Sequence, residues 1–145
     1  MIIVKGDKYA PSVADLSYWA WPTDRPYTIT SYYGWRWGEF HDALDIYVGF
    51  GSPIYAANNG IAVKVWYDGV GGYQVLIAHS NNYYTWYAHL AASIVKAGDP
   101  ITRGQKIGTM GCTGSACTGT HLHFAAYKGR PAAGGVSFNA MTLYR

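Results

Sequence analysis

Long apolar stretches are missing from this chain, and charged residues are scarce. No apolar run approaches the roughly 20 residues of a membrane-spanning helix, so we predict no membrane span. Only 13% of the residues are charged while 50% are hydrophobic, and this balance argues against intrinsic disorder. The net charge of +3 is too small, and its charges too scattered, to predict nucleic-acid binding, although it suits an anionic polymer.

The first residues also lack the features of a secretory leader. Met1–Asp7 has no basic segment followed by a long apolar core, so we predict no signal peptide in this chain. We therefore expect an intracellular protein, one that leaves by another route such as a phage particle, or an excised domain. A length of 145 residues suits one domain, which we expect to be monomeric in isolation. We divide it into an amino-terminal extension over residues 1–23, packed on or flanking a main domain over residues 24–145.

A helical period is likewise absent. No segment keeps an apolar 3.6-residue repeat for three turns, and only Leu90–Val95 is predicted to form a single helical turn. Short β-branched or aromatic runs alternate instead with Gly, Asn, Asp or Pro, and Ser80–Asn82 is predicted to be a hairpin turn. This pattern predicts an all-β fold with strands at Tyr27–Ser31, Pro53–Ala56, Ile61–Tyr67, Gln74–His79, Tyr83–His89, Lys106–Met110 and His121–Tyr127.

Aromatic residues are abundant, with 14 Tyr and 6 Trp in the chain, and seven of them fall between Trp19 and Trp37. The plainer interpretation is that β-rich cores and sheet faces favour such side chains. The alternative is a groove that stacks against sugar or peptide, because Tyr and Trp offer large, rigid contact surfaces.

Two histidines separated by one residue, His121 and His123, carry the strongest chemical signal. On a β-strand they point to the same face, with Cα atoms roughly 6.5 to 7 Å apart. The intervening Leu122 and the following Phe124 then face the core. One imidazole can bind a metal while the other contacts its water, and a His and an Asp from elsewhere would complete the three ligands of a catalytic zinc site. Two polar groups placed there by chance are the alternative.

His41 and Asp45 are the candidates for the missing ligands. On an extended strand, residues four apart are separated by about 13 Å, too far to share one metal through bonds of about 2.1 Å. The stretch must therefore curl, either as a helical turn or as a loop that enters a strand at Asp45–Tyr47, and Gly38 favours the loop. A surface loop that merely carries two polar residues is the alternative.

The two remaining histidines end predicted strands. By strict alternation His89 falls on the same face as Thr85 and Tyr87, and its free pKa of about 6.5 suits acid–base chemistry. His79 lies beside the hairpin turn, and we predict a structural or solvated role for it.

The two cysteines, Cys112 and Cys117, allow three interpretations. With His121 and His123 they could form a closed Cys2His2 structural zinc site, but the histidines of such sites usually follow about a dozen residues later. That site would also leave the other two candidate ligands without a role. A disulfide that closes the short loop is favoured and would imply an oxidising location, and two free thiols are the third option.

Taken together, these segments resemble the lysostaphin-type (LytM-like) zinc endopeptidases, which cut the peptide part of bacterial peptidoglycan. The resemblance runs from about Trp21 to Arg145, and its specificity lies in the order and spacing of the segments rather than in any one of them. The matching segments are Ile29–Arg36, His41–Asp45, Gly60–Val63, Thr85–Leu90, Gly104–Gly108 and Thr118–Phe124.

The resemblance implies roles for five residues and a fold. His41, Asp45 and His123 would bind one zinc ion, and His89 and His121 would be the catalytic histidines beside it. The implied fold is a compact antiparallel β domain with a central groove over the sheet.

The chain departs from the family pattern at three positions. Ala43 stands where the family usually has Gly, and Thr120 stands where Pro is common. A Tyr that assists catalysis in some relatives falls near Trp35, so we assign no such role here. None of these departures removes a predicted ligand or catalytic histidine, and we expect an active enzyme.

The expected activity is zinc-assisted hydrolysis of a peptide bond in peptidoglycan, by an extracellular, cell-wall-directed or virion-associated enzyme such as a phage lysin. In this scheme His121 takes a proton from water, while His89 orients the water or stabilises the oxyanion. A non-catalytic module that binds peptidoglycan, or activates another enzyme, is the alternative function on the same fold. The sequence leaves open whether the bond lies in a glycine-rich cross-bridge, at a D-alanyl–diaminopimelate link or in the stem peptide.

Overall fold

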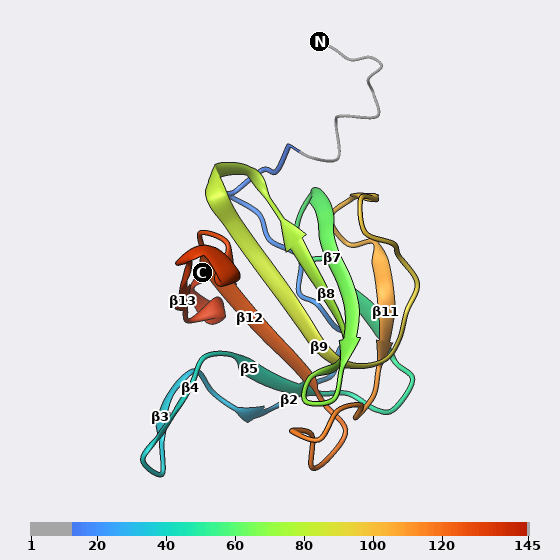
Figure 1. The fold of residues 1–145 in the computed structure, drawn as a ribbon, viewed down its shortest axis with the longest axis vertical. Helices are drawn as coiled ribbons and strands as arrows, with labels where there is room; N and C mark the ends of the chain where they lie inside the picture. Colours follow the sequence, from blue (N-terminus) through green and yellow to red (C-terminus); the bar gives the residue numbers. More distant parts are fainter. Residues whose placement is uncertain (1–12, 145) are drawn as a thin grey trace.

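Ten antiparallel strands form the sheet on which the fold is built, and a two-stranded hairpin projects from it (Figure 1). The computed structural model describes residues 13–144. The hairpin consists of β3 (Gly34–Arg36) and β4 (Glu39–His41). The strands of the large sheet are β2 (Thr28–Ser31), β5 (Leu44–Tyr47), β6 (Pro53–Tyr55), β7 (Gly60–Asp68), β8 (Gly72–Ala78), β9 (Tyr83–Ser93), β10 (Pro100–Ile101), β11 (Lys106–Met110), β12 (Leu122–Lys128) and β13 (Val136–Phe138).

The strand order places β9 and β12 side by side in the middle of the sheet. Along the main path the order is β10-β7-β8-β9-β12-β5-β2, with β13 paired to β12 and β11 joining β9 to β6. Within residues 13–144 the helical structure consists of the short 3-10 segments Ser80–Asn82, Pro131–Ala133 and Ala140–Tyr144. The all-β antiparallel prediction is therefore confirmed. No helix in this part of the chain is long and apolar enough to cross a bilayer.

The predicted helical turn over Leu90–Val95 is wrong, because β9 continues to Ser93. The end of β9 pairs with β11, where Gly108 lies opposite Ser93. This pairing satisfies the backbone polar groups of the stretch and so favours extended structure over a helical turn. Glycine is required where β11 pairs with β9, since a Cβ on Gly108 would lie 2.5 Å from the Ala92 carbonyl oxygen.

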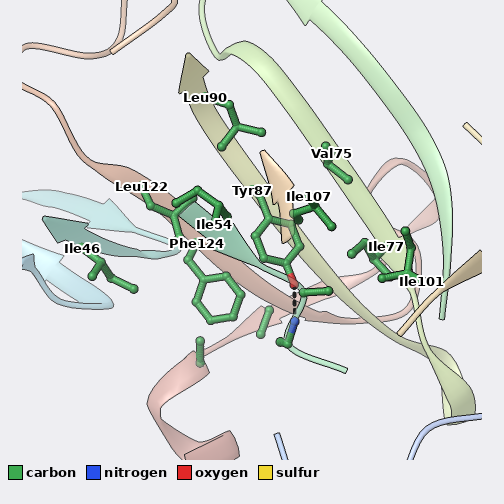
Figure 2. Close-up of a cluster of buried hydrophobic side chains, with 14 of the residues drawn as sticks. Ile46, Ile54, Val75, Ile77, Tyr87, Leu90, Ile101, Ile107, Leu122 and Phe124 are labelled. Carbon is green, nitrogen blue, oxygen red and sulfur yellow. Dashed lines mark hydrogen bonds between the residues drawn. The ribbon is translucent and has the colours of Figure 1, made fainter. Parts of the chain in front are cut away.

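The hydrophobic core packs against one face of β9 and β12, and the side chains that these strands direct to that face are buried. Strands β6 and β11 pair with each other and contribute their apolar side chains to the same core. The largest fully buried side chains from these four strands are Tyr87, Phe124, Leu122, Leu90, Ile54, Ile107 and Met110, and most are labelled in Figure 2. Burying a side chain of this size contributes about 1.5–3 kcal/mol. The opposite face of β12, which carries His123, is left free to build a site.

A chain of hydrogen bonds crosses this core and ends on His79. The Tyr87 hydroxyl accepts the Ala57 N–H at 2.9 Å, drawn as a dashed line in Figure 2, and lies 2.8 Å from Thr85 Oγ1. Thr85 Oγ1 is 2.7 Å from His79 Nε2, and His79 Nδ1 donates to the Asn59 carbonyl oxygen at 2.7 Å. Burial lowers the pKa of His79 to about 4. Of the two predicted roles for this histidine, the structure supports the structural one.

Residues 13–23, part of the predicted extension, pack on the rest of the domain. Trp19 is buried, with its ring edge-on to that of His79 at 5.2 Å. The Tyr144 hydroxyl donates to the Ala20 carbonyl oxygen at 2.9 Å and ties the two ends of the described chain together. The domain boundary at residue 23 stays a prediction, and the predicted lack of a leader over Met1–Asp7 lies outside the described residues.

The aromatic stretch between Trp19 and Trp37 divides into two groups. Trp21 stacks on Tyr27 with ring centroids 4.5 Å apart, beside the buried Trp19. Trp35 and Trp37 lie on the projecting hairpin and are 76% and 97% exposed. The core interpretation therefore holds for the first group, and the stacking interpretation stays a prediction for the hairpin.

Candidate metal centre

Strand register brings the predicted metal ligands together. In the β5–β12 pair Asp45 lies directly opposite His123, and β4 ends at His41. His41 Nε2 and His123 Nδ1 each lie 3.3 Å from Asp45 Oδ1. The curl that the sequence requires is a short loop between β4 and β5. Ala43 in that loop is buried and lies outside the positive-φ region, so its Cβ is tolerated where the family usually has Gly.

His41 is buried and its ring is held from behind. Its Nδ1 lies 3.1 Å from the Tyr32 carbonyl oxygen and 3.3 Å from Ser31 Oγ. A carbonyl oxygen only accepts, so Nδ1 carries the proton and Nε2 presents its lone pair to the site. Burial lowers the pKa of His41, but Asp45 and the Tyr32 carbonyl outweigh burial, and the pKa is raised overall.

His121 and His89 complete the cluster with the same tautomer. His121 Nδ1 donates to the Gly119 carbonyl oxygen at 2.7 Å, and its Nε2 lies 3.5 Å from Asp45 Oδ1. His89 Nδ1 donates to the Thr113 carbonyl oxygen at 2.8 Å. The ring centroids of the two histidines are 5.0 Å apart. Both rings therefore keep Nε2 free of backbone partners and available for chemistry.

His89 reaches the cluster through an irregularity in β9. Strict alternation would place it on the face of Tyr87, which is fully buried in the core, so the predicted face of His89 is wrong. Two residue steps on β8, from Tyr73 to Val75, are matched by three on β9, from Tyr87 to Leu90, which is a β-bulge. His89 has a φ of 63°, and this left-handed backbone, uncommon for a non-glycine residue, turns its side chain to the site.

Three side chains beside the cluster are missed by the sequence reasoning. Asp42 Oδ1 lies 3.9 Å from His123 Nε2, and Asp42 Oδ2 accepts the Tyr127 hydroxyl at 3.0 Å. Burial and the nearby charge of Asp42 raise the pKa of Tyr127 to about 12. Arg36 Nη1, from the hairpin, is 4.0 Å from Asp45 Oδ2. Asp42 and Arg36 do have a signal in the sequence, because they lie inside the matching segments His41–Asp45 and Ile29–Arg36, whereas Tyr127 lies outside all of these segments.

Two hollows that share no lining residue adjoin the cluster. The first has a volume of about 310 Å³, and its lining includes His89, His123, Asp42, Trp86 and Tyr127. The second has a volume of about 500 Å³, and its lining includes His121, Asp45, Arg36 and the segment Thr118–Thr120. Four of the five predicted site residues therefore line one hollow or the other, and the buried His41 lines neither.

The family model described as Peptidase family M23 matches residues 39–136, which is more than half of the chain. The chain belongs to peptidase family M23. All five predicted site residues of this M23 domain fall inside the matched region.

Relatives of this M23 domain include proteins named as peptidoglycan endopeptidases. The domain is 44% identical over 84 residues to the peptidoglycan DD-endopeptidase ShyC of Vibrio cholerae, a match to 58% of the chain and 19% of ShyC. It is 38% identical over 89 residues to lysostaphin of Staphylococcus simulans, a match to 60% of the chain and 18% of lysostaphin. The chain thus spans about a fifth of the length of these curated relatives.

A solved structure confirms the M23 fold. The catalytic domain of EnpA, a prophage-encoded M23 protein from Enterococcus faecalis, superposes with a TM-score of 0.73 at 32% identity. The match covers 80% of this chain and 90% of that domain. The described residues therefore contain close to the whole of the fold seen in that catalytic domain.

The donor set of this M23 domain fits a metal ion. Asp45 Oδ1 is buried and accepts no hydrogen bond from the described residues, although three histidine nitrogens lie 3.3 to 3.5 Å away. Burying a carboxylate oxygen without a hydrogen-bond partner costs free energy, and a cation bound between this oxygen and the histidine nitrogens would remove that cost. Burial opposes ionisation of Asp45, but His123 and His41 outweigh it and hold its pKa well below the usual range. Imidazoles and one carboxylate are a donor set of catalytic zinc sites.

Among residues 13–144, two sets of three ligand atoms are close enough for one ion, and both include His123. In each set the atoms lie within 4.8 Å of one another. The predicted set adds His41 and Asp45, while the rival set adds His89 and His121. Only the predicted set contains the unpaired carboxylate oxygen and supplies a negative charge against the cation. The electrostatics therefore favour the predicted set.

Cys112 and Cys117 form a disulfide, with Cα atoms 5.4 Å apart. Metals bind cysteine as the thiolate, and neither sulfur is available in that form. The closed Cys2His2 site considered from the sequence is therefore excluded, and the histidines next to this loop are left to the metal centre.

Proposed function

We propose that this M23 domain is a zinc-dependent endopeptidase that hydrolyses peptide bonds of bacterial peptidoglycan. The observation that carries the proposal is the unpaired carboxylate oxygen of Asp45 with three histidines around it and His89 packed against two of them. The likeness to ShyC, a peptidoglycan DD-endopeptidase by name, supports the substrate class. The net charge of +3 is compatible with binding to an anionic wall.

In this proposal one zinc ion is held by His41 Nε2, Asp45 Oδ1 and His123 Nδ1. Zinc bound there supplies a Lewis acid that polarises a carbonyl and makes water more acidic. Asp42 places a carboxylate charge behind His123, because its Oδ1 lies 3.9 Å from His123 Nε2, beyond hydrogen-bond length, while its other oxygen accepts the Tyr127 hydroxyl.

His121 is the proposed general base. Because its Nδ1–H is engaged by the Gly119 carbonyl, Nε2 carries the lone pair that accepts a proton from the attacking water. The same atom then returns that proton to the leaving amine. His89 has the same tautomer, held by Thr113, so its Nε2 can accept a hydrogen bond and orient the water.

The two hollows support cleavage within a peptide rather than from its end. An endopeptidase needs space for substrate on both sides of the scissile bond, and the hollows of about 310 and 500 Å³ adjoin the histidine cluster separately. An extended peptide running through both would present one carbonyl to the centre of the cluster.

Action on peptidoglycan places the proposed enzyme at the cell wall, either exported or carried on a virion as a phage lysin. The Cys112–Cys117 disulfide supports an oxidising location. The likeness to the prophage-encoded EnpA supports a phage source. Detection of the protein in purified virions would test that source directly.

The decisive experiment measures release of fragments from purified walls by zinc-loaded protein. His121→Ala and His89→Ala should each slow cleavage by about 100-fold or more, the usual contribution of a general acid or base, while zinc stoichiometry is retained. Ile94→Ala changes an exposed apolar side chain and is the control for handling of the variants. Full cleavage by both histidine variants would overturn the assignment.

The same assay separates the non-catalytic alternative and identifies the bond. A binding module would pellet with walls at stoichiometric zinc and release nothing, whereas the proposed enzyme loses its activity on chelation and regains it with zinc. Mass spectrometry of fragments from walls of defined cross-link chemistry assigns the cleaved bond to the cross-bridge or the stem peptide.

A further inference from the structure

One connection carries the hydrogen-bond acceptors of both proposed catalytic histidines. It is the loop Gly111–Thr120 between β11 and β12, here called the clamp loop, coloured orange in Figure 1. The Thr113 carbonyl accepts from His89 Nδ1 at 2.8 Å, and the Gly119 carbonyl accepts from His121 Nδ1 at 2.7 Å. An imidazole that donates to a fixed carbonyl is held in one tautomer and one orientation. The path of the clamp loop therefore sets where both free Nε2 atoms point.

The first arm of the clamp loop, Gly111–Gly114, is held by the sheet. Thr113 Oγ1 donates to the Leu90 carbonyl oxygen at 2.6 Å and accepts the Tyr73 N–H at 3.0 Å. These bonds anchor Thr113 between β8 and β9. The acceptor of His89 is therefore fixed by contacts in which no cysteine takes part.

The second arm, Cys117–Thr120, is held differently. It is joined to the first arm by the disulfide to Cys112 and by a long hydrogen bond from the Cys117 N–H to the Gly114 carbonyl oxygen at 3.3 Å. The residues that flank it are held by backbone hydrogen bonds, from the Ala116 N–H to the Val70 carbonyl oxygen at 3.1 Å and from the His121 N–H to the Gly111 carbonyl oxygen at 3.2 Å. Cys117 Sγ lies 3.1 Å from the Gly119 carbonyl oxygen and 3.6 Å from His121 Nδ1, so the sulfur packs against both partners of that hydrogen bond. A Cβ built on Gly119 would meet none of the described residues within 4 Å, so the side of Gly119 from which a side chain would project is open.

We infer that the Cys112–Cys117 disulfide is a positioning element for His121, and that opening it slows hydrolysis without releasing the metal. The inference rests on the catalytic role proposed for His121. Opening the disulfide removes the covalent tie on the arm that carries Gly119 and leaves it only its backbone hydrogen bonds, so His121 loses its fixed acceptor and its single tautomer. Loss of such a partner typically costs about 10- to 100-fold in activity. His89, anchored through the first arm, keeps its tautomer and serves as an internal reference.

The test compares oxidised wild type with the double variant Cys112→Ser/Cys117→Ser, both loaded with zinc. We expect kcat for fragment release to fall by about 10- to 100-fold, with KM and zinc stoichiometry unchanged. Nitrogen-15 NMR should show the Nδ1–H tautomer of His121 in wild type and a tautomer mixture in the variant, with His89 the same in both. Ser115→Ala alters an exposed side chain of the same loop and should keep full kcat.

A second route keeps the test valid if the double variant does not fold, which thermal unfolding would reveal. Wild type treated with a phosphine reductant, well below its melting temperature, then replaces the variant. Where the variant folds, the reductant should not change it, which controls for metal taken up by the reagent.

The outcomes separate this inference from the proposed function. Equal kcat and an unchanged His121 tautomer after reduction would overturn the inference while leaving the proposed enzyme intact. Absence of cleavage by oxidised, zinc-loaded wild type would count against the enzyme instead, and the NMR comparison would still decide the positioning role of the disulfide.

Discussion

Acidification should destabilise this protein through His79, which lies in the core and outside the metal centre. Its Nδ1 donates to the Asn59 carbonyl oxygen, so Nε2 of the neutral ring accepts the Thr85 hydroxyl proton. Thr85 Oγ1 in turn accepts from the Tyr87 hydroxyl, whose oxygen already accepts the Ala57 N–H. A proton on His79 Nε2 would remove the acceptor of the Thr85 hydroxyl and leave one hydroxyl proton of the Thr85–Tyr87 pair without an acceptor.

The size of the effect follows from the pKa of His79. Burial lowers this pKa from 6.5 to about 4, so between these values the unfolded chain binds a proton that the folded chain excludes. The contribution of His79 to stability is therefore complete above pH 6.5 and is lost as the pH falls towards 4. The difference between the two pKa values corresponds to about 3 kcal/mol, a large part of the stability of a typical domain.

Urea unfolding of metal-free wild type and His79→Asn isolates this contribution. Asn keeps a donor for the Asn59 carbonyl but does not titrate, and the other titrating groups cancel in the difference between the proteins. The advantage of wild type should be constant above about pH 7 and shrink by about 3 kcal/mol on acidification to about pH 4. A difference that stays constant over this range would refute the buried, neutral state of His79.

Two further predictions concern the metal centre and the hairpin. Zinc at 100-fold excess over its Kd should raise the free energy of unfolding of wild type by about 2.7 kcal/mol, and by much less in Asp45→Asn; equal gains would show that Asp45 is not a ligand. Trp37→Ala, at a side chain 97% exposed, should change stability by less than about 0.5 kcal/mol yet weaken binding in a wall-pelleting assay. Ile94→Ala, also exposed but on the β9–β11 side of the molecule, is the matched control. Unaltered pelleting of the Trp37 variant would mean that the hairpin does not touch the wall.

Alternation in the sequence predicts the site wherever a strand is regular. Leu122 and Phe124 are fully buried, and His123 lies on the opposite face, as the period of two requires. Alternation predicts the wrong face for His89, because a β-bulge shifts the faces of the residues in β9. The bulge depends on how β8 pairs with β9 and cannot be recognised from the sequence of polar and apolar residues.

Other parts of the site depend on contacts between distant segments. The curl between His41 and Asp45 follows from the length of metal bonds, but the position of Arg36 depends on a hairpin whose strands have only three residues each. Tyr127 reaches Asp42 only because β12 runs beside β5. The pairing of the cysteines stayed open for the same reason, since spacing alone does not determine the path of the clamp loop.

The register that sets Asp45 opposite His123 also makes the proposed metal site dependent on correct pairing of β5 with β12. A slip of one residue between β5 and β12 would bring an apolar neighbour opposite His123 and turn the Asp45 carboxylate into the core. A chain with that shifted register would keep much of its secondary structure but would lack the complete set of predicted metal ligands. Zinc uptake by the proposed site during refolding should therefore distinguish chains with the native register from misregistered ones, whereas spectroscopy of the backbone alone would not separate the two.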